Sequence, residues 1–295
     1  MTRGITVLLS SYNGEKYIAG QLDSILAQTL PPRAVLVRDD GSADHTPEIL
    51  ETYADAGKIR LLRGENVGFR ESFRLLLEAC PEEDDFAFSD QDDLWFPEKL
   101  ARARKALDAA DSRIPCLYHG AYSLGDEQLR PIGSCLPPRP PFTFRRCLTE
   151  NVLSGFAMVG NAALRRAMLS ADWSRIDFHD WLAGAIALGT GTLIMDDTVT
   201  SVHRRLRTSV TAGSALKGIR WAVSALFRDT NMKKRNTAFA EAFASALSPE
   251  NRAVLDLMIS CRFRDRLRKA FYPARWRYAL PDELAARLAM LRGTL

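Results

Sequence analysis

The first ninety residues alternate between two hydrophobic patterns. Four short apolar runs, rich in Val, Ile, Leu and Phe, end in polar turn-forming residues and predict buried strands. Between them, apolar residues recur every three or four positions, as in a helix with one buried face. The predicted strands are 5–13, 34–42, 58–64 and 85–90, and the predicted helices are 15–28, 47–57 and 70–80. This alternation indicates an α/β fold with a mostly parallel sheet covered on both faces.

The pattern becomes less regular after residue 100. Its predicted elements are a surface loop in the Pro-rich stretch 133–146, an extended piece and a helix over 151–169, a helix over 178–189, and a strand with a turn over 191–205. After about Thr211 the chain is helical, basic and aromatic. We therefore expect one α/β domain of residues 1–213 and a helical C-terminal extension of residues 214–295.

The composition is that of an ordinary globular protein. The chain has 295 residues, of which 46% are hydrophobic and 26% are charged. It contains no run of 18 apolar residues and no signal-peptide pattern, so we expect neither a membrane span nor secretion. The five cysteines are widely spread and form no CxxC pair, which favours reduced thiols and a cytoplasmic location.

Charge is distributed unevenly around the net value of +4. Residues 201–295 contain 19 Lys and Arg against 7 Asp and Glu, which leaves 21 against 29 for residues 1–200, so the balances are +12 and −8. Arginines mix with aromatic residues in "FRDRLRKAFYPARWRY" (263–278). Such a basic region suits anionic lipid headgroups, so we expect peripheral contact with the inner face of a membrane; a helical cap with solvated arginines is the alternative. No nucleic-acid-binding motif accompanies the charge, and we expect no nucleic-acid partner.

Polar clusters follow three of the predicted strands. They are "SSYN" after the first strand, "DDGS" after the second and "SDQDD" after the fourth. Ligands of open α/β sheets bind beyond the carboxyl ends of the strands, so the three clusters are expected to meet in one crevice. Neither a GxxxxGK[ST] phosphate loop nor a GxGxxG dinucleotide fingerprint occurs at these positions.

The third cluster is unusually acidic. Asp90, Asp92 and Asp93 fall within four positions, and Phe, Leu and Trp residues flank them. Two like charges about 4 Å apart repel by about 4 kcal/mol at the effective dielectric of a protein surface. Three crowded carboxylates therefore predict a bound cation, and a solvated acidic turn is the alternative reading.

Together these motifs resemble family 2 of the nucleotide-sugar glycosyltransferases, which have the fold called GT-A. The markers are "VLLSSYNGEKYIAGQLDSILAQT", "VLVRDDGSADHT", "ENVGF" and "SDQDDLWFPEKL", and the similarity extends from about Ile5 to Gly213. The DQDD form is most similar to the rhamnosyltransferase-like branch, which builds bacterial surface polysaccharides. The resemblance implies inverting transfer of a sugar to a glycan or lipid-linked glycan acceptor. A dTDP-rhamnose donor is the first expectation and a UDP-sugar the second.

The resemblance also implies a divalent metal, Mg²⁺ or Mn²⁺, between the acidic turn and the donor diphosphate. Asp92 is then the metal ligand, and Asp90 meets the ribose or a metal-bound water, while Asp93 supports the turn. Relatives often carry a YRxH pattern after the last strand, but Leu206 stands here at the position of its His. The missing contact falls either to His203 as a metal ligand or to Arg204 or Arg205 as a phosphate clamp.

Four residues are implied around the nucleotide. Asp40 would accept a hydrogen bond from the imide N–H of uracil or thymine, and Tyr12 would stack on the base. Ser10 would lie against the base, and Asn66 would border the same pocket. The alternatives are turn chemistry for Asp40 and core packing for Tyr12.

An inverting transfer needs one general base, and the resemblance implies Asp180, in "FHDWL", for that role. Its position at the start of a predicted helix is expected to keep the carboxylate ionised. A helix-start acid without chemistry is the alternative, and Glu150 and Asp177 are then the next candidates. We expect His179 to orient its neighbours or to belong to the core.

Two other functions remain open. A sugar nucleotidyltransferase would share a related sheet but would carry a Gly-rich loop with Lys or Arg after the first strand, which "SSYNGEKY" does not match. A glycan- or lipid-binding protein without catalysis would not need Asp40, Asp92 and Asp180 together.

Overall fold

The computed structural model describes residues 4–138, 140–205 and 231–295. Its strands are β1 (Ile5–Ser11), β2 (Ala34–Asp39), β3 (Arg60–Arg63), β4 (Asp85–Ser89), β5 (Leu94–Trp95), β6 (Cys116–Gly125), β7 (Pro131–Cys135), β8 (Met158–Gly160) and β9 (Thr192–Arg204). Its longer helices are α1 (Ile18–Leu26), α2 (Thr46–Asp55), α3 (Phe69–Ala79), α4 (Lys99–Asp108), α6 (Ala162–Leu169) and α7 (His179–Thr190), followed by α9 (Asn231–Phe243), α10 (Pro249–Ile259), α11 (Phe263–Ala270) and α12 (Leu280–Arg292). A short helix, α5, covers Phe144–Cys147.

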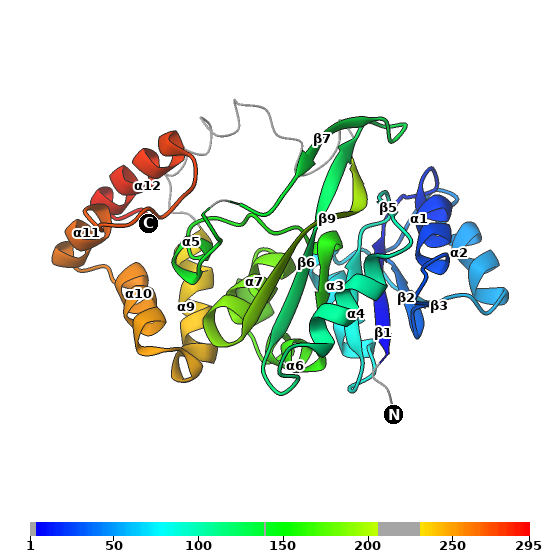
Figure 1. Ribbon diagram of the computed structural model, residues 1–295, viewed down its shortest axis with the longest axis horizontal. Coiled ribbons are helices and arrows are strands. Elements are labelled where there is room, and N and C mark those ends of the chain that lie inside the picture. The colour runs from blue at the N-terminus through cyan, green and yellow to red at the C-terminus, as the bar shows by residue number, and fades with distance from the viewer. Residues whose placement is uncertain (1–3, 139, 206–230) are drawn as a thin grey trace.

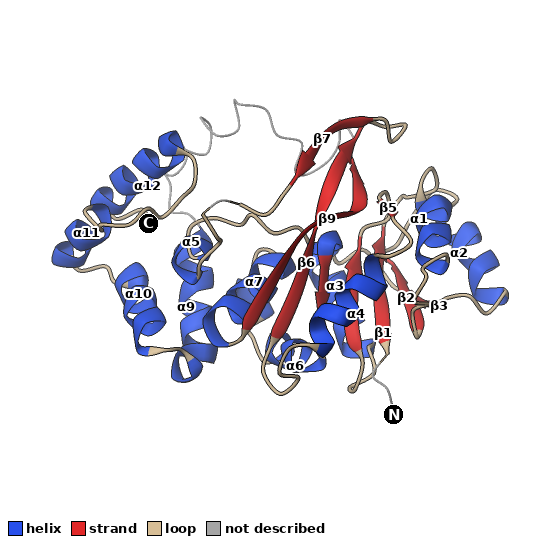
Figure 2. Ribbon diagram, viewed as in Figure 1, coloured by secondary structure: helices blue, strands red, loops and turns tan. Residues whose placement is uncertain are grey.

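One mixed sheet runs through the molecule in the order β3-β2-β1-β4-β8-β6-β9-β5, with β7 paired to β6 (Figure 2). The pairings among β1 to β4 are parallel, as is the pairing of β6 with β9. The strand β8 runs antiparallel to β4 and β6, β7 runs antiparallel to β6, and β5 runs antiparallel to β9. The predicted α/β fold with a mostly parallel sheet is therefore confirmed. The carboxyl ends of β1, β2 and β4 lie along the same edge because these strands are in parallel register.

Helices cover both faces of the sheet, and alternate residues of the strands supply two separate cores. On β1, Val7 and Leu9 pack with α1, α2 and α4, whereas Leu8 points to the other face and packs with α3, α6 and α7. Successive side chains of a strand point to opposite faces, so a strand buried on both sides reads as the continuous apolar run seen in the sequence.

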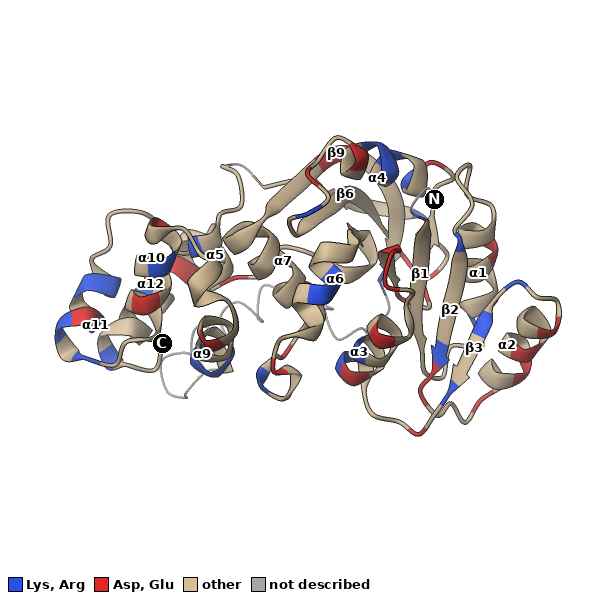
Figure 3. Cartoon of the chain, turned by 90° about the horizontal axis from the view of Figure 1, so that it is seen from below, with Lys and Arg blue, Asp and Glu red and all other residues tan. Residues whose placement is uncertain are grey.

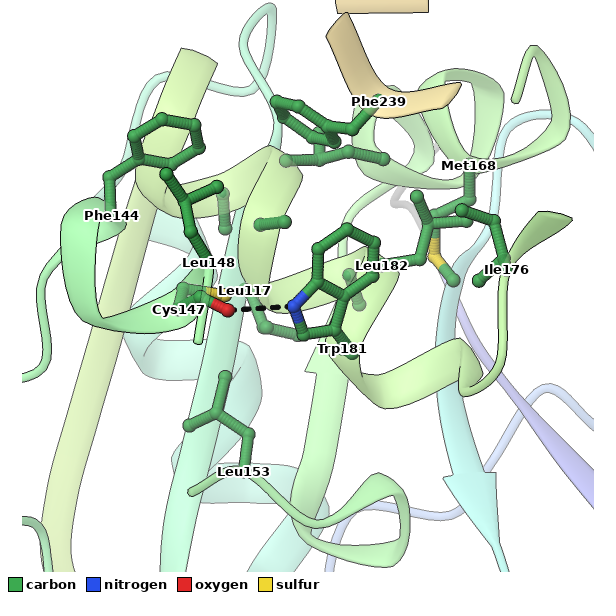
Figure 4. Close-up of a cluster of buried hydrophobic side chains, with 14 of the residues drawn as sticks. Leu117, Phe144, Cys147, Leu148, Leu153, Met168, Ile176, Trp181, Leu182 and Phe239 are labelled. Carbon is green, nitrogen blue, oxygen red and sulfur yellow. Dashed lines mark hydrogen bonds between the residues drawn. The ribbon is translucent and has the colours of Figure 1, made fainter. Parts of the chain in front are cut away.

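The predicted C-terminal helices are present, and they pack onto the second of these cores. Phe239 of α9 lies 6.2 Å from Trp181 of α7 and 5.7 Å from Phe144 of α5, measured between ring centroids. The Trp181 ring is fully buried, and its Nε1 donates to the Cys147 carbonyl at 2.8 Å (Figure 4). This packing fixes the start of α7, which carries Asp180. The proposed boundary between residues 213 and 214 lies outside the described residues.

The structure differs from the prediction in the Pro-rich stretch 133–146. That stretch is not one loop, because β7 ends within it and α5 begins within it. Pro131 is the first residue of β7, which pairs with β6. Proline lacks a backbone N–H and is tolerated at the first residue of a strand at the edge of a sheet. None of the helices in the described parts of the chain is long and apolar enough to span a bilayer.

Candidate functional site

The acidic turn after β4 is tied to the end of β9. The buried Asp93 accepts hydrogen bonds at Oδ1 from the backbone N–H of Arg204 (3.2 Å) and faces Nδ1 of His203 at 2.8 Å. Arg204 also donates from Nε to the carbonyl of Asp92 at 2.8 Å. Two segments that are 110 residues apart in the chain therefore form one hydrogen-bonded corner, in which Asp93 connects the acidic turn to the end of β9.

Crowding in this turn makes its carboxylates hard to ionise. Burial, and then the charges of Asp93 and Asp92, raise the pKa of Asp90 to about 8. Burial and the charge of Asp93 raise the pKa of Asp92 to about 6. Burial and mutual repulsion both disfavour the charged carboxylates, and a cation placed beside them would relieve the repulsion.

His203 lies where a metal or a phosphate contact was predicted. Its ring stacks on Phe156 with centroids 4.6 Å apart and planes 10° apart. Burial alone would lower the pKa of His203, but the hydrogen bond with Asp93 and the charges of the turn raise it above its usual value. Arg204, the alternative, uses its guanidinium on the carbonyls of Asp92 and Glu127. Leu206, which stands in place of the expected His, lies outside the described residues.

The residues of this corner fit a divalent cation only as a partial ligand set. Carboxylate oxygens are hard ligands of the kind that Mg²⁺ and Mn²⁺ prefer, and burial together with the neighbouring carboxylates raises the pKa values of Asp90 and Asp92. Within residues 4–138, 140–205 and 231–295, no group of three or more His, Cys, Asp and Glu side chains could enclose a metal. Mg²⁺ commonly takes only one or two protein carboxylates and completes its shell with phosphates and water.

The two aspartates after β2 are both buried, and both have protein partners. Asp39 accepts from the hydroxyl of Ser42 at 2.5 Å. Asp40 forms an ion pair with Arg38 and accepts from the backbone N–H groups of Val67 (3.0 Å) and Gly68 (2.9 Å). Asp40 therefore fixes the entry into α3, and its predicted contact with a base stays a prediction.

The other predicted nucleotide contacts surround the same edge of the sheet. The ring of Tyr12 is about half exposed, and its backbone N–H and carbonyl both bond to the side chain of Gln91, at 2.8 and 3.0 Å. Ser10 shares a 2.7 Å hydrogen bond with Ser72 of α3, and the exposed Asn66 accepts from Gly68 N–H. Gln91 thus connects the acidic turn to the segment after β1, which the sequence pattern did not reveal.

Asp180 lies at the start of α7 and belongs to the same site. Its Oδ1 accepts from the side-chain amide of Asn151 at 3.0 Å and from the backbone N–H of Trp181 at 2.6 Å. The rings of its neighbour His179 and of Phe88 in β4 lie 4.6 Å apart, so the start of α7 packs on the strand that leads into the acidic turn. After burial and the charges of Asp93 and Asp92, the charge of Asp180 also raises the pKa of Asp90. Burial raises the pKa of Asp180 to about 6 despite both donors. The expected effect of the helix start is therefore outweighed by burial, and the group titrates near neutral pH.

The other acids and the histidine near Asp180 have structural roles. Glu150 accepts from the backbone N–H of Tyr278 at 2.9 Å, and Asp177 accepts from Asn231 at 3.2 Å, so both bond to the C-terminal helical region. His179 is buried among phenylalanine rings, and burial lowers its pKa to about 3. His179 is therefore a neutral residue of the core, which is one of the two roles expected for it from the sequence.

The chain is similar in sequence to a known protein family and to curated proteins. The family model described as glycosyl transferase family 2 matches residues 6–173, more than half of the chain. EpsH of Bacillus subtilis, a protein named as a glycosyltransferase, is 27% identical over 172 residues, which are 58% of this chain and 49% of EpsH. An uncharacterized glycosyltransferase of Nostoc is 28% identical over 160 residues, which are 54% of this chain and 47% of the relative. The chain thus spans about half the length of these relatives.

Two solved structures resemble the whole chain in fold. S. aureus TarS in complex with UDP-GlcNAc aligns with a TM-score of 0.57 and 18% identity, covering 97% of this chain and 90% of TarS. The mannosyltransferase PcManGT of Pyrobaculum calidifontis, in complex with GDP-Man and Mn²⁺, aligns with a TM-score of 0.54 and 18% identity, covering 99% of this chain and 75% of PcManGT. At such low identity the similarity shows a shared fold, which is of the GT-A type predicted from the sequence.

Proposed function

The chain belongs to glycosyl transferase family 2, and from this membership we propose that it is an inverting, metal-dependent glycosyltransferase. It moves a sugar from a nucleoside-diphosphate sugar to a glycan acceptor. The observation that carries the proposal is the packing of the start of α7 on the end of β4, where the rings of His179 and Phe88 lie 4.6 Å apart, so that Asp180 and the acidic turn after β4 come from neighbouring elements. A base and a diphosphate site must lie near each other to act on the same anomeric carbon.

Asp180 is the proposed general base. Both of its protein donors bind Oδ1, so Oδ2 is the oxygen that we expect to face the acceptor hydroxyl. As the acceptor oxygen bonds to the anomeric carbon, its proton passes to Asp180 and the bond between the anomeric carbon and the diphosphate oxygen breaks. A pKa of about 6 suits this role, because the base is ionised at neutral pH and still accepts a proton readily.

Asp92 and His203 are proposed to hold a Mg²⁺ or Mn²⁺ ion, with Asp90 on the ribose or on a metal-bound water. When bound, the ion would stabilise the charge of the departing diphosphate. PcManGT, which shares the fold, was solved with Mn²⁺, and this supports the assignment by analogy. Tyr12, Ser10 and Asn66 would line the nucleotide pocket, and Asp40 would select uracil or thymine.

We propose dTDP-rhamnose as the first donor to test and UDP-sugars as the second, because the DQDD turn is most similar to the rhamnosyltransferase-like branch. The proposed acceptor is a glycan or lipid-linked glycan of bacterial surface polysaccharide synthesis. The catalytic unit is proposed to be residues 1–213, with residues 214–295 as the extension. The protein would act in the cytoplasm, at the inner face of a membrane, where anionic lipids attract its basic region.

The test is release of nucleoside diphosphate from dTDP-rhamnose, UDP-GlcNAc and GDP-mannose, each with Mn²⁺ and with EDTA. Asp180→Asn is expected to bind donor normally and to lower transfer by about 10²–10⁴-fold, the usual contribution of a general base. The matched control is Asp177→Asn, which changes an acid three residues away and should keep near-normal transfer. If only Asp177→Asn abolished transfer, the base would be misassigned.

The same assay separates the rival functions. A sugar nucleotidyltransferase would release pyrophosphate from a nucleoside triphosphate and a sugar phosphate, and it would not consume the nucleotide sugar by transfer to a glycan. A binding protein without catalysis would give a thermal shift with a nucleotide sugar or glycan but no turnover. Either result would replace the glycosyltransferase proposal.

A further inference from the structure

The last two helices expose rows of large apolar side chains. On α11, Phe263, Leu267 and the following Phe271 are 72%, 39% and 75% exposed. On α12, Leu280, Leu284 and Leu288 are each about half exposed, at 52–55%. The spacing of four residues places each row along one side of its helix. We call these six residues the apolar face.

The apolar face is a concentrated feature rather than ordinary scatter. It holds six of the thirteen large hydrophobic residues that are exposed in the described parts of the chain. The opposite side of α12, with Ala286, Ala289 and Met290, is fully buried against the protein. The two helices pack against each other at the end of the molecule opposite β3 (Figure 1). Globular proteins rarely expose large apolar side chains clustered in this way unless the surface binds a partner.

Positive charge is concentrated in the same region of the chain. Residues 261–292 contain nine Lys and Arg against three Asp and Glu, a balance of +6. Lys269 is buried and Arg287 is paired with Glu283, so the charge that faces solvent lies on the exposed arginines. Arg264 and Arg268 of α11 are exposed, and the basic residues run along that helix in Figure 3. A helical surface with large apolar side chains on one side and arginines beside them is typical of proteins that lie in the interface of an anionic bilayer.

Two other aromatic residues of this region, Trp276 and Tyr272, do not belong to the exposed surface. The Trp276 ring is fully buried and donates from Nε1 to the Lys269 carbonyl at 3.0 Å, and Tyr272 lies half-buried against it with ring centroids 5.0 Å apart. These rings hold the helices together from inside. The exposed groups are the phenylalanines and leucines, which are the residues that insert among acyl chains.

We propose that the apolar face of α11 and α12 docks the protein on an anionic lipid bilayer. The six apolar side chains enter the headgroup–acyl boundary, and Arg264 and Arg268 contact lipid phosphates. Charge complementarity favours this partner over a second copy of the chain, because two copies joined through this face would bring their arginines together. This docking surface would be the membrane contact of the proposed function. Only the identity of the acceptor, a lipid-linked glycan, rests on that proposed function.

The test is co-sedimentation of the full chain with vesicles, without any donor present. We expect binding to vesicles of phosphatidylcholine mixed with phosphatidylglycerol, weak binding to phosphatidylcholine alone, and release at high salt. Phe263→Gln with Phe271→Gln should weaken binding by about tenfold or more, because two exposed apolar anchors are lost. Arg264→Gln with Arg268→Gln should weaken binding to the anionic vesicles only. The control, Ile132→Gln with Leu136→Gln, removes two residues exposed by 58% and 61% outside these helices and should bind normally.

Three outcomes would overturn the proposal. The first is a wild-type protein that does not bind anionic vesicles, and the second is a phenylalanine variant that binds as tightly as the control. The third is a dimer in light scattering that the phenylalanine variant converts to a monomer, which would assign the face to a second copy. Transfer to a water-soluble acceptor is measured on the same variants. A phenylalanine variant that loses vesicle binding but keeps transfer supports the membrane role of the apolar face. A wild-type protein that binds vesicles but shows no transfer contradicts the proposed function and leaves the membrane proposal intact.

Discussion

The hydrogen bond between Asn151 and Asp180 gives the sharpest test of the proposed base. Its donor, Nδ2 of Asn151, lies 3.0 Å from Oδ1 of Asp180 and stabilises the ionised carboxylate. A hydrogen bond to a charged group contributes about 1.5–3 kcal/mol, and a shift of one pKa unit corresponds to about 1.4 kcal/mol. Because Asp180 is partly exposed and water can replace the amide, we take the lower end. Asn151→Ala should therefore raise the pKa of Asp180 by about one unit.

The sign of the effect on activity follows from the role of the base. Transfer requires the ionised carboxylate, so kcat/KM rises with pH through the pKa of Asp180, which burial raises to about 6. A higher pKa moves this acidic limb to higher pH, and Asn151→Ala should place it about one unit above the wild-type limb. Well above both values the two proteins should reach similar rates, because the base is then fully ionised in each.

The assay is kcat/KM against pH at saturating Mn²⁺, so that a bound cation holds the acidic turn ionised throughout. Asn151→Asp keeps an acceptor for the Leu153 N–H but exchanges the donor for a like charge, and it should shift the limb further than Asn151→Ala. The control is Asn231→Ala, which loses a contact with Asp177 and none with Asp180. If the limb stayed in place in both Asn151 variants, its titration would belong to another group and Asp180 would not be the base.

Two further predictions concern the donor. Asp92→Asn should remove most activity and weaken metal-dependent donor binding while the melting temperature holds; an unchanged thermal shift by donor with Mn²⁺ would remove Asp92 from the metal site. Asp40→Ala should lower the melting temperature, because Val67 and Gly68 N–H lose their acceptor, and should also reduce the preference for UDP and dTDP over ADP in competition. A lower melting temperature with the preference intact would leave Asp40 with only its structural role.

The first half of the fold could be predicted because local periodicity decides it. The apolar runs at β1, β2 and β4 are buried on both faces, and their polar ends must share an edge once the strands are parallel. The direction of the strands alone therefore led to the prediction that Tyr12, Asp40 and Asp92 lie around one crevice. Such predictions need only the strand period and the direction of the chain.

The supporting contacts could not be predicted in this way. The pairs His203 with Asp93, Gln91 with Tyr12 and Asn151 with Asp180 join segments that are 110, 79 and 29 residues apart. A hydrogen bond between remote segments leaves no period in the sequence, because it depends on how the sheet brings their ends together. The effect of burial on Asp180 was missed for the same reason.

The Pro-rich stretch shows a different limit. The proline and glycine residues of 133–146 led to the prediction of one surface loop, yet β7 extends into this stretch because it pairs with the extended end of β6. The pairing is a tertiary effect that overrides local composition. The burial of Trp276 is a similar case, since this residue lies in the connection between α11 and α12, where no helical or strand period tells which side chains face the protein.

The distribution of positive charge around the acidic turn bears on why a metal would be needed. Arg38 is paired with Asp40, and Arg204 binds the carbonyls of Asp92 and Glu127. His203 faces Asp93, and Lys99 is fully buried over the Trp95 ring, where burial lowers its pKa to about 7. Arg38, Arg204 and His203 thus already have partners within the protein, and burial disfavours the charged form of Lys99. A diphosphate and a row of carboxylates repel each other unless a cation lies between them, so the same contacts that hold the corner together favour a divalent ion as the shared counter-charge.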